Sequence, residues 1–402
     1  MRPEPGKVPA EAVKNQYEQY PFPPLTVGAL EDVKPCQADY TFAYHYQRPN
    51  TGTLLKAPRI LDAGCGTGFS TLKLAQLNPD AEITAVELSH NALDIARQRL
   101  RAAGLSHRVR FYQGDLQEAE VVEKLTQGQH CFYDYLHCSG VIHHIPQAAR
   151  ALRHLRQCLK PSALAYFMVY GEQARREISQ IQDIVYLLWQ DHDNWQEGLQ
   201  RCRAFLAELP VTHPLKQFHL KALNRVTYLL GEEVTHSDAF WVDTYLQRCE
   251  HLWDARTWQT LLKEAGFEPG RWLDESTWQL ATYTPECARS FCLPPETELK
   301  LVERLRPAHH FAHFATMHTA QQSPQRAVFE ATHEVLYPLA SITPYPLEKQ
   351  WSVENQLGQK ILLDAGEWSL WQRMNGSDTC EQMLHQHLQA FPEADKNSLE
   401  AS

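Results

Sequence analysis

The chain has 402 residues, of which 43% are apolar and 21% charged, and its formal net charge is −10 at pH 7. This is the balance of a globular protein with two or three domains. The acidic charge argues against a surface that is basic throughout and binds nucleic acid. No apolar run approaches the roughly 20 residues of a membrane-spanning helix, and the first residues lack the apolar core of a signal peptide. We therefore expect no membrane partner.

Ten cysteines are scattered along the chain without a C-x-x-C pair. Several of them, such as Cys65, Cys138 and Cys158, lie within apolar or glycine-rich stretches, as buried thiols do. This pattern favours reduced cysteines over disulfides, and so it favours a cytoplasmic location.

The N-terminal residues 1–50 are rich in aromatic side chains, and Pro21, Pro23 and Pro24 fall within the sequence QYPFPPLT. Closely spaced prolines hold the backbone extended. We expect an irregular segment here, before the regular elements begin.

From residue 51 to 170, short apolar strands alternate with helices. The predicted strands are PRILDAG, AEITAVELS, RVRFYQGD, a segment within HCFYDYLHCSGVIHHI, and ALAYFMVYG. In the helix SHNALDIARQRLRAAGL, Ser89 is the expected N-cap and Gly104 follows the end. Strands this uniformly apolar belong to a parallel sheet that helices cover on both faces. We predict an α/β fold with a doubly wound, mostly parallel sheet.

A helical segment interrupts this alternation at residues 171–254. It contains Trp189, Trp195 and Trp241, which suit either core packing or an aromatic cage for a cation. The sequence DARTWQTLLKEAGFEPGRW then resumes the order of helix and strand. Because ligands of open sheets bind beyond the carboxyl ends of the strands, an insertion at this point is placed to roof an acceptor pocket.

Beyond residue 285 the pattern of the sheet ends. The cluster AHHFAHFATMH holds four histidines: His309, His310, His313 and His318. If the segment were helical, His309 and His313 would lie on the same face of the helix. No glutamate or cysteine completes a common zinc pattern, so we predict no metal. Residues 361–402 predict two short helices that resemble a winged-helix module, but seven acidic residues against two basic ones disfavour contact with phosphate.

The stretch LDAGCGTGFS places Gly64, Gly66 and Gly68 two residues apart, directly after the first strand. Such a turn brings the backbone close to a ligand. Its spacing, G-x-G-x-G, differs from the G-x-G-x-x-G turn that holds a pyrophosphate. Asp62 stands before the turn, where a carboxylate repels phosphate and suits an ammonium group. The turn therefore indicates a ligand without phosphates.

Two further acids follow the next two strands. Glu87 ends the second strand, where a carboxylate can accept hydrogen bonds from both hydroxyls of a ribose. Asp115 follows the third strand and is placed to accept from an adenine amino group. A ligand with an amino-acid end, a ribose diol and an adenine matches all three acids. S-adenosylmethionine has these parts and no phosphate.

In chain order, ILDAGCGTG, AVELS, GDL and YDYLHCSGVIHHIP resemble the successive signatures of class I S-adenosylmethionine-dependent methyltransferases over residues 59–170. The resemblance implies S-adenosylmethionine as cofactor and methyl transfer as the reaction. It places nine residues at the cofactor: Asp62, Gly64, Cys65, Gly66, Glu87, Leu88, Asp115, Leu116 and Ser139. The stretch QYEQYPFPP resembles a lead segment that folds over the cofactor in some of these enzymes, which makes Tyr17 and Tyr20 candidates for a lid.

The methyl acceptor is not indicated by any single motif. His143 and His144 follow the fourth strand, where an acceptor would approach and an imidazole can take a proton, although HHIP can equally begin a loop with one packed histidine. The sequence DYLHCSG lacks the Asn/Asp-Pro-Pro-Tyr/Phe pattern that serves methylation of adenine or glutamine amides. We lean slightly to a protein or peptide side chain as acceptor. A small metabolite, or a regulatory protein that binds the cofactor without turnover, are the alternatives.

These observations divide the chain into three parts. Residues 1–50 form a lid segment, and residues 51–285 form an S-adenosylmethionine-binding domain that contains the helical cap insertion 171–254. Residues 286–402 form a C-terminal extension with a small, mainly helical end that resembles a winged helix at 361–402. An oxidoreductase that uses NAD is disfavoured, because the glycine spacing differs from the dinucleotide pattern.

Overall fold

A computed structural model describes residues 2–29, 35–47, 55–129, 132–273, 275–290, 293–306, 311–317, 345–347, 350–354 and 360–363. The chain divides into two compact units, residues 1–43 with 53–320 and residues 44–52 with 321–402. In the second unit, three strands form an antiparallel sheet: β8 (Tyr345–Leu347), β9 (Gln350–Glu354) and β10 (Lys360–Leu363). The two helices predicted after residue 363 lie outside the described residues.

The first unit is built on a seven-stranded sheet with the order β3-β2-β1-β4-β5-β7-β6. Its strands are β1 (Arg59–Ala63), β2 (Glu82–Glu87), β3 (Val109–Gln113), β4 (Tyr133–Ser139), β5 (Leu159–Val169), β6 (Phe267–Trp272) and β7 (Phe311–Met317). The first five strands pair in parallel, and β7 is antiparallel to both β5 and β6. The predicted α/β class with a mostly parallel sheet is confirmed.

Helices connect the strands and cover both faces of the sheet: α3 (Phe69–Leu77), α4 (His90–Ala102), α5 (Ala119–Thr126), α6 (Ala148–Cys158) and α12 (Ala255–Glu264). Ser89 caps α4, because its hydroxyl accepts a hydrogen bond from the amide of Ala92. Asp254 caps α12 through the amide of Thr257 in the same way. Four further short helices are α2 (Tyr40–Gln47), α13 (Leu280–Tyr283), α14 (Pro285–Ser290) and α15 (Pro295–Leu305).

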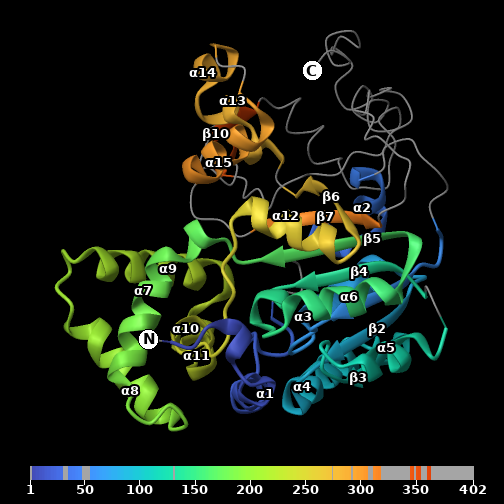
Figure 1. Cartoon of the computed structure of the whole chain (residues 1–402), viewed down its shortest axis with the longest axis horizontal. Helices are drawn as coiled ribbons and strands as arrows, with labels where there is room; N and C mark the ends of the chain where they lie inside the picture. Colours follow the sequence, from blue (N-terminus) through green and yellow to red (C-terminus); the bar gives the residue numbers. More distant parts are fainter. Residues whose placement is uncertain are drawn as a thin grey trace. The chain divides into compact units, whose positions relative to one another are not determined.

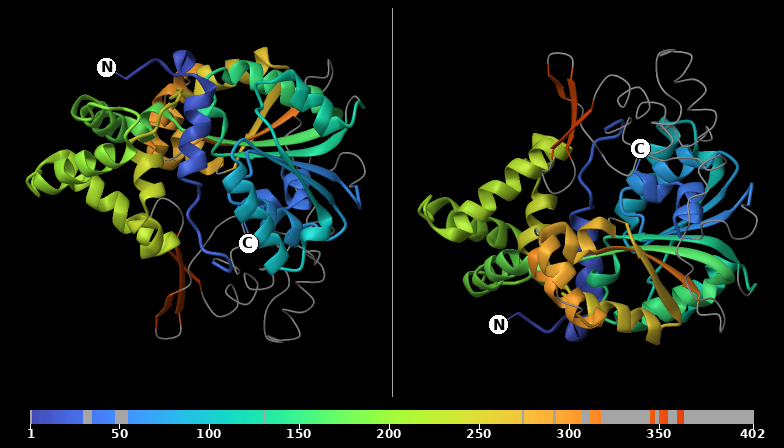
Figure 2. Two further views of the ribbon diagram at one scale, coloured as in Figure 1. Left: turned by 90° about the horizontal axis from the view of Figure 1, so that it is seen from below. Right: turned by 90° about the horizontal axis from the view of Figure 1, so that it is seen from above.

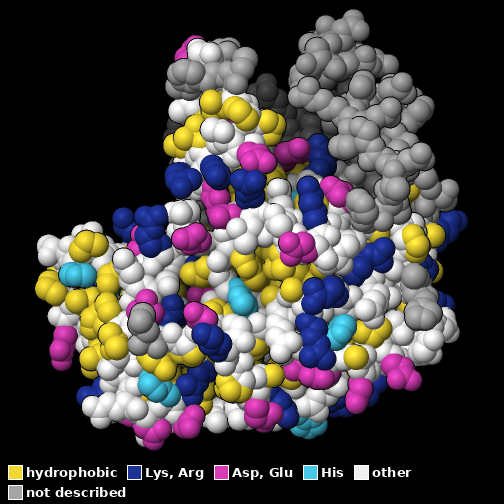
Figure 3. Space-filling view, in the orientation of Figure 1, with side chains coloured by type: hydrophobic (Ala, Val, Ile, Leu, Met, Phe, Trp, Pro, Cys, Tyr) yellow, Lys and Arg dark blue, Asp and Glu magenta, His cyan; other side chains and the backbone are white. Residues whose placement is uncertain are grey.

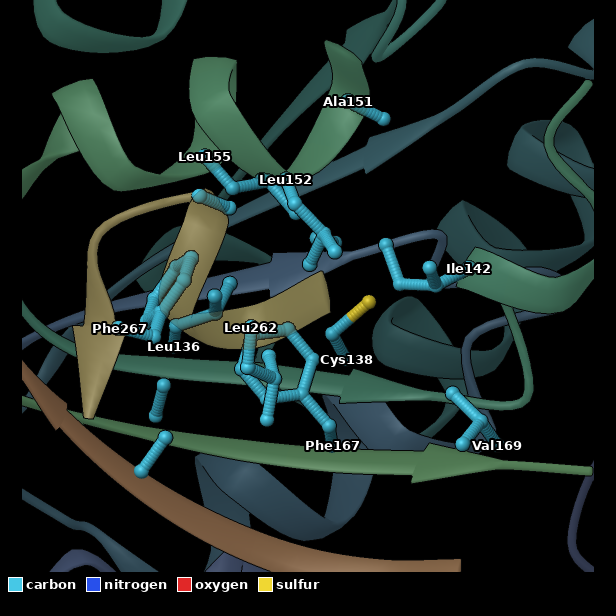
Figure 4. Close-up of a cluster of buried hydrophobic side chains, with 14 of the residues drawn as sticks. Leu136, Cys138, Ile142, Ala151, Leu152, Leu155, Phe167, Val169, Leu262 and Phe267 are labelled. Carbon is cyan, nitrogen blue, oxygen red and sulfur yellow. The ribbon is translucent and has the colours of Figure 1, made fainter. Parts of the chain in front are cut away.

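The main core lies between the sheet and helices α6 and α12 (Figure 4). Leu136 of β4 and Phe167 of β5 belong to one buried cluster with Leu152 of α6 and Leu262 of α12. Burial of each such side chain contributes about 1.5–3 kcal/mol to folding. This packing holds the carboxyl ends of β4 and β5 in fixed positions.

Five helices stand between β5 and α12: α7 (Glu172–Leu188), α8 (Trp195–Glu208), α9 (Pro214–Leu230), α10 (Glu232–His236) and α11 (Asp238–Tyr245). We call them the cap helices. They have a core of their own that includes Trp189, Trp195 and Leu199. Figure 1 shows them beyond the end of the sheet toward which β4 and β5 point.

The N-terminal segment lies between the cap helices and the sheet, as both views of Figure 2 show for α1 (Ala10–Gln19). The carboxylate of Glu18 accepts hydrogen bonds from the amides of His90 and Asn91 at 2.8 and 3.0 Å, which fixes α1 to the start of α4. Farther along, Thr67 donates from its amide to the carbonyl of Phe22 and from its hydroxyl to the carbonyl of Pro23. The extended segment therefore lies directly on the glycine turn.

Strand β7 differs from the sequence analysis, which ended the sheet near residue 285 and considered a helix around His313. That side chain is fully buried in the strand, and its Nε2 donates to the carbonyl of Gly270 at 2.9 Å. Burial lowers the pKa of His313 to about 4, so the ring is neutral. The strand is covered on both faces, so its apolar pattern lacks the alternation that marks a strand. The other three histidines of the cluster lie outside the described residues.

Three further observations concern the described residues only. They contain no group of three or more side chains placed to hold a metal ion. Six of their cysteines are free thiols: Cys36, Cys65, Cys138, Cys158, Cys202 and Cys249. None of their helices has the length and apolar character needed to cross a membrane.

Candidate active site

A cavity of about 330 Å³ lies at the carboxyl ends of β1, β2, β4 and β5. Small-molecule sites have volumes of about 300–1,000 Å³, so the cavity is large enough for a ligand of moderate size. Its lining includes the carboxylates of Glu87, Asp115 and Asp243, and no lysine or arginine of the described residues. This distribution of charge suits a cationic ligand and disfavours a pyrophosphate.

The turn after β1 forms one side of the cavity, and it requires glycine at three positions. Gly64, Gly66 and Gly68 have φ angles of +74°, +52° and +83°, where a residue with a Cβ atom is strained. A Cβ on Gly66 would lie 2.4 Å from the carbonyl oxygen of Phe22, and one on Gly64 would lie 2.3 Å from Val141. The glycines thus permit close contact with neighbouring backbone and side chains as well as with a ligand.

Asp62 lies beneath this turn and does not line the cavity. One carboxylate oxygen accepts from the hydroxyls of Ser70 and Thr71 at 2.8 and 2.7 Å, and the other lies 3.1 Å from Nδ1 of His137. These three partners compensate for the burial of the charge, because the side chain is only 1% exposed. Asp62 was predicted to contact the cofactor, but it lies behind the lining of the cavity. It orients His137, which does line the cavity.

Glu87 ends β2 and lines the cavity. Its two carboxylate oxygens accept from the amides of Gly66 and Ser89, each at 3.0 Å. Burial raises the pKa of Glu87, and the two amides partly oppose this rise. Each oxygen keeps a second lone pair, so a fixed carboxylate is available for a pair of hydroxyl groups.

Asp115 lines the cavity beyond the end of β3. Its Oδ1 accepts from the amide of Gln117 at 2.8 Å, and the side-chain amide of Gln117 lies 3.1 Å from both carboxylate oxygens. The side-chain oxygen Oε1 of Gln117 accepts a hydrogen bond from the backbone amide of Gln147 at 2.8 Å. This chain of bonds fixes the orientation of Asp115.

The cavity brings together most of the residues that the sequence analysis named. Its lining includes Tyr17, Gly64, Cys65, Gly66, Glu87, Leu88, Asp115, Leu116, Ser139 and His144. Tyr20 lies elsewhere and packs edge-on against Trp195, with 5.7 Å between ring centroids. His143 is fully buried beside the cavity and stacks on Tyr170 at 3.7 Å. We call the part of the lining from residues 64–117 the sheet wall.

The opposite part of the lining, which we call the cap wall, consists of Tyr17, His144, Tyr170 and Asp243. The hydroxyl of Tyr17 donates to Oδ1 of Asp243 at 3.0 Å. Nδ1 of His144 lies 2.9 Å from the carbonyl of Cys249, and a carbonyl only accepts, so this nitrogen carries the proton of the neutral ring. Burial raises the pKa values of Tyr17 and Asp243.

Tyr170 is held from two sides. His143 stacks on its ring, and the guanidinium of Arg175 lies 4.1 Å from the ring centroid. Two groups this close cannot share one face, so both faces of the ring are covered. Arg175 is itself buried and forms an ion pair with Glu250. No motif pointed to Arg175 and Glu250, because they come from helix α7 and from the loop after the cap helices.

A parallel sheet extended by an antiparallel β7, with a glycine turn after β1 and acids after β2 and β3, defines a Rossmann-like nucleotide-binding domain. Residues 61–165 match a family model described as a methyltransferase domain. The structure of PKMT2 from Rickettsia typhi in complex with AdoHcy is similar to this chain, with a TM-score of 0.64 and 14% identity, over 95% of this chain and 74% of that one.

Two curated relatives are similar in sequence. An uncharacterized protein of Synechococcus, syc1184_c, is 36% identical over 213 residues, which are 52% of this chain and 48% of that protein. The malonyl-[acyl-carrier protein] O-methyltransferase of Halalkalibacterium halodurans is 34% identical over 120 residues, which are 30% of this chain and 41% of that enzyme. This chain therefore spans less than half the length of either relative.

The match over residues 61–165 and the fold shared with a structure in complex with AdoHcy support a class I S-adenosylmethionine-dependent methyltransferase domain, with S-adenosylmethionine as its cofactor. The residues of the cavity fit this cofactor. The lining has no cation that would pair with a phosphate, and Glu87 presents a fixed carboxylate after β2 where a ribose diol is expected.

Proposed function

We propose that the chain transfers the methyl group of S-adenosylmethionine to a side chain of a protein or peptide. The observation that carries the proposal is one continuous cavity with two chemically different walls. The sheet wall has the acids expected at a nucleoside, and the cap wall faces it with Tyr17, His144 and Asp243. The bound cofactor supplies an electrophilic methyl group, so the protein has to position the acceptor, exclude water and accept a proton.

Each wall then has a distinct task. In the sheet wall, Glu87 would hold the ribose hydroxyls and Asp115 the adenine amino group, while the loop that begins at Ser139 would border the sulfur. Asp62 would act through His137, which it orients at 3.1 Å. Tyr17 and the extended segment on the glycine turn would cover the cofactor, because Phe22 and Pro23 also line the cavity.

Two observations support a protein or peptide acceptor. PKMT2, a protein methyltransferase, shares the fold over 94% of this chain. Hydrophobic side chains also gather over α7–α9 in Figure 3. In this part of the chain, Leu187, Val211 and Tyr228 are 71%, 68% and 68% exposed. Exposed apolar groups of this size mark surfaces that contact other macromolecules.

A small metabolite is the second candidate, because the N-terminal segment roofs the cavity and limits access to it. A sequence relative is named as an O-methyltransferase of malonyl-[acyl-carrier protein], in which the methylated group is an acyl group and not an amino-acid side chain. A regulatory protein that binds the cofactor without turnover is the third candidate.

One experiment separates the three candidates. S-adenosylhomocysteine is titrated into the purified chain by calorimetry, and the chain is then incubated with methyl-labelled S-adenosylmethionine and a bacterial extract. Label in the acid-precipitated fraction supports a protein acceptor, and label confined to the low-mass filtrate supports a metabolite. Saturable binding of S-adenosylhomocysteine without label in either fraction identifies a binding protein.

A further inference from the structure

One carboxylate of the cap wall keeps an oxygen that the protein does not use. Asp243 is 5% exposed and lines the cavity. The hydroxyl of Tyr17 and the side-chain amide of Gln247 both direct their hydrogen bonds to Oδ1, at 3.0 and 3.4 Å. Within the described part of the chain, no group donates a hydrogen bond to Oδ2, and this oxygen is not among the fully buried atoms that lack a partner, so it is open to the cavity.

The surroundings of Asp243 do not neutralise its charge by an ion pair. The described residues place no lysine or arginine nitrogen within 4.0 Å of the carboxylate. The buried cation nearby, Arg175, pairs with Glu250 and covers the ring of Tyr170. Nδ1 of His144 directs its proton to the carbonyl of Cys249 and does not bond Asp243. Asp243 is therefore the acid of the cap wall, and the lining of the cavity holds no lysine or arginine of the described residues.

We propose that Asp243 selects an amine as the methyl acceptor and that its Oδ2 binds the acceptor nitrogen and takes a proton from it. This inference rests on the proposed methyl transfer and adds the chemical class of the acceptor. An ammonium group matches the unused oxygen in charge and in donor capacity. A carboxylate or phosphate acceptor is repelled by Asp243, so the same residue acts against anionic acceptors.

Asp243, the amine and the cofactor together account for every proton, bond and electron pair in the proposed transfer. The bound ammonium passes one proton to Oδ2 of Asp243, which becomes a neutral carboxylic acid. The freed nitrogen lone pair attacks the methyl carbon, a C–N bond forms as the C–S bond breaks, and the sulfur keeps the electron pair as a neutral thioether. The product nitrogen is then a methylammonium. Burial raises the pKa of Asp243, which makes the carboxylate a better proton acceptor than an exposed one.

The test uses the full chain, methyl-labelled S-adenosylmethionine and a bacterial extract in two forms, untreated and with primary amines acetylated. Label on nitrogen survives alkali, whereas a methyl ester releases volatile methanol. We expect alkali-stable label that falls at least about tenfold after acetylation. We expect Asp243→Asn to lower kcat/KM at least about tenfold while it leaves the Kd of S-adenosylhomocysteine within about twofold, which separates an acceptor role from a structural one.

Asp238→Asn is the matched control, because Asp238 lies on the same helix α11 and pairs with Arg203 away from the cavity. It should leave the transfer rate unchanged. Alkali-labile label, or label that acetylation does not reduce, would overturn the inference while the proposed methyl transfer stands. Absence of any label despite binding of S-adenosylhomocysteine would overturn the proposed transfer and this inference with it. The acetylation and alkali arms use the wild-type chain, so they decide the question even if Asp243→Asn does not fold.

Discussion

The two walls of the cavity are assembled in different ways. The sheet wall comes from residues 64–117, a single stretch in which each functional side chain follows the end of one parallel strand. The cap wall joins Tyr17 to Asp243, which are 226 residues apart, together with His144 and Tyr170. A wall built from strand ends is set by the fold of the sheet. The cap wall depends in addition on how α11 and the N-terminal segment, which supply Asp243 and Tyr17, pack against the ends of β4 and β5.

This difference separates specificity for the cofactor, which we expect in the sheet wall, from specificity for the acceptor, which we expect in the cap wall. The sheet wall can keep one cofactor while the cap wall changes with the acceptor, because the cap helices have a separate core. Substitutions in the sheet wall should therefore change cofactor affinity. Substitutions in the cap wall should change the transfer step and leave cofactor affinity nearly unchanged.

The largest effect is expected from Gly66→Ala in the sheet wall. The new Cβ would lie 2.4 Å from the carbonyl oxygen of Phe22 at a φ of +52°, so the turn and the segment on it have to move apart. A strain of about 3 kcal/mol corresponds to roughly a hundredfold weaker binding of S-adenosylhomocysteine, which calorimetry measures. Gly104→Ala is the control, because Gly104 has a φ of +70° and no atom near its added Cβ. Equal losses in the two variants would contradict the role of the close contact.

The next effect is expected from Glu87→Gln. Loss of a charged acceptor costs about 1.5–3 kcal/mol, so the Kd of S-adenosylhomocysteine should rise about 10- to 100-fold. Glu82→Gln on the same strand is the control, because Glu82 is exposed at the surface. An unchanged Kd for Glu87→Gln would remove this residue from the ribose site.

The same carboxylate predicts a pH dependence of cofactor binding. Because burial raises the pKa of Glu87, protonation begins at a higher pH than it does for an exposed glutamate. The protonated form loses acceptor capacity, so the affinity for S-adenosylhomocysteine should fall as the pH is lowered into this range. Glu87→Gln should flatten the profile and Asp243→Asn should not. Calorimetric titrations at a series of pH values compare the three proteins.

A smaller effect is expected in the cap wall from Tyr17→Phe. The change removes the hydroxyl that donates to Asp243 at 3.0 Å, which costs about 1 kcal/mol and should slow transfer about fivefold. Binding of S-adenosylhomocysteine should change little. Tyr20→Phe is the control, because the Tyr20 ring packs on Trp195 outside the cavity. If both variants slow transfer alike, the hydroxyl of Tyr17 has no special part in it.

The smallest effect is expected from Glu18→Gln, which tests how the lead segment is fixed. The amides of Asn91 and His90 outweigh partial burial and lower the pKa of Glu18. The pKa of such a carboxyl is lower in the folded chain than in the unfolded chain. Its full contribution to stability is therefore present at pH values above the pKa of the unfolded chain, and it is lost as the pH falls through the pKa of the folded chain. The variant should lose about 1 kcal/mol of unfolding free energy near neutral pH. Glu11→Gln, exposed on the same helix, should lose less, and equal losses would contradict the capping role.

Sequence patterns alone were sufficient for most of the sheet and for the sheet wall. Each parallel strand is a short apolar run that ends in a turn, and each acid of that wall follows such a run, so local order implied spatial order. Asp62, which lies just before this wall in the sequence, is the exception, because it does not line the cavity. Its place at the turn was predictable, but only the packing of Ser70, Thr71 and His137 around it decided that it faces inward.

Only the tertiary structure decided the cap wall and the last strand of the sheet. Asp243 lies on the short helix α11, which no motif of the sequence marks, and its pairing with Tyr17 depends on how α1 docks between the cap and the sheet. Strand β7 is buried on both faces, so its sequence shows no alternation, and its partner β5 lies far away in the chain. Short-range periodicity records which face of an element is buried, but it carries no information about which distant element buries it.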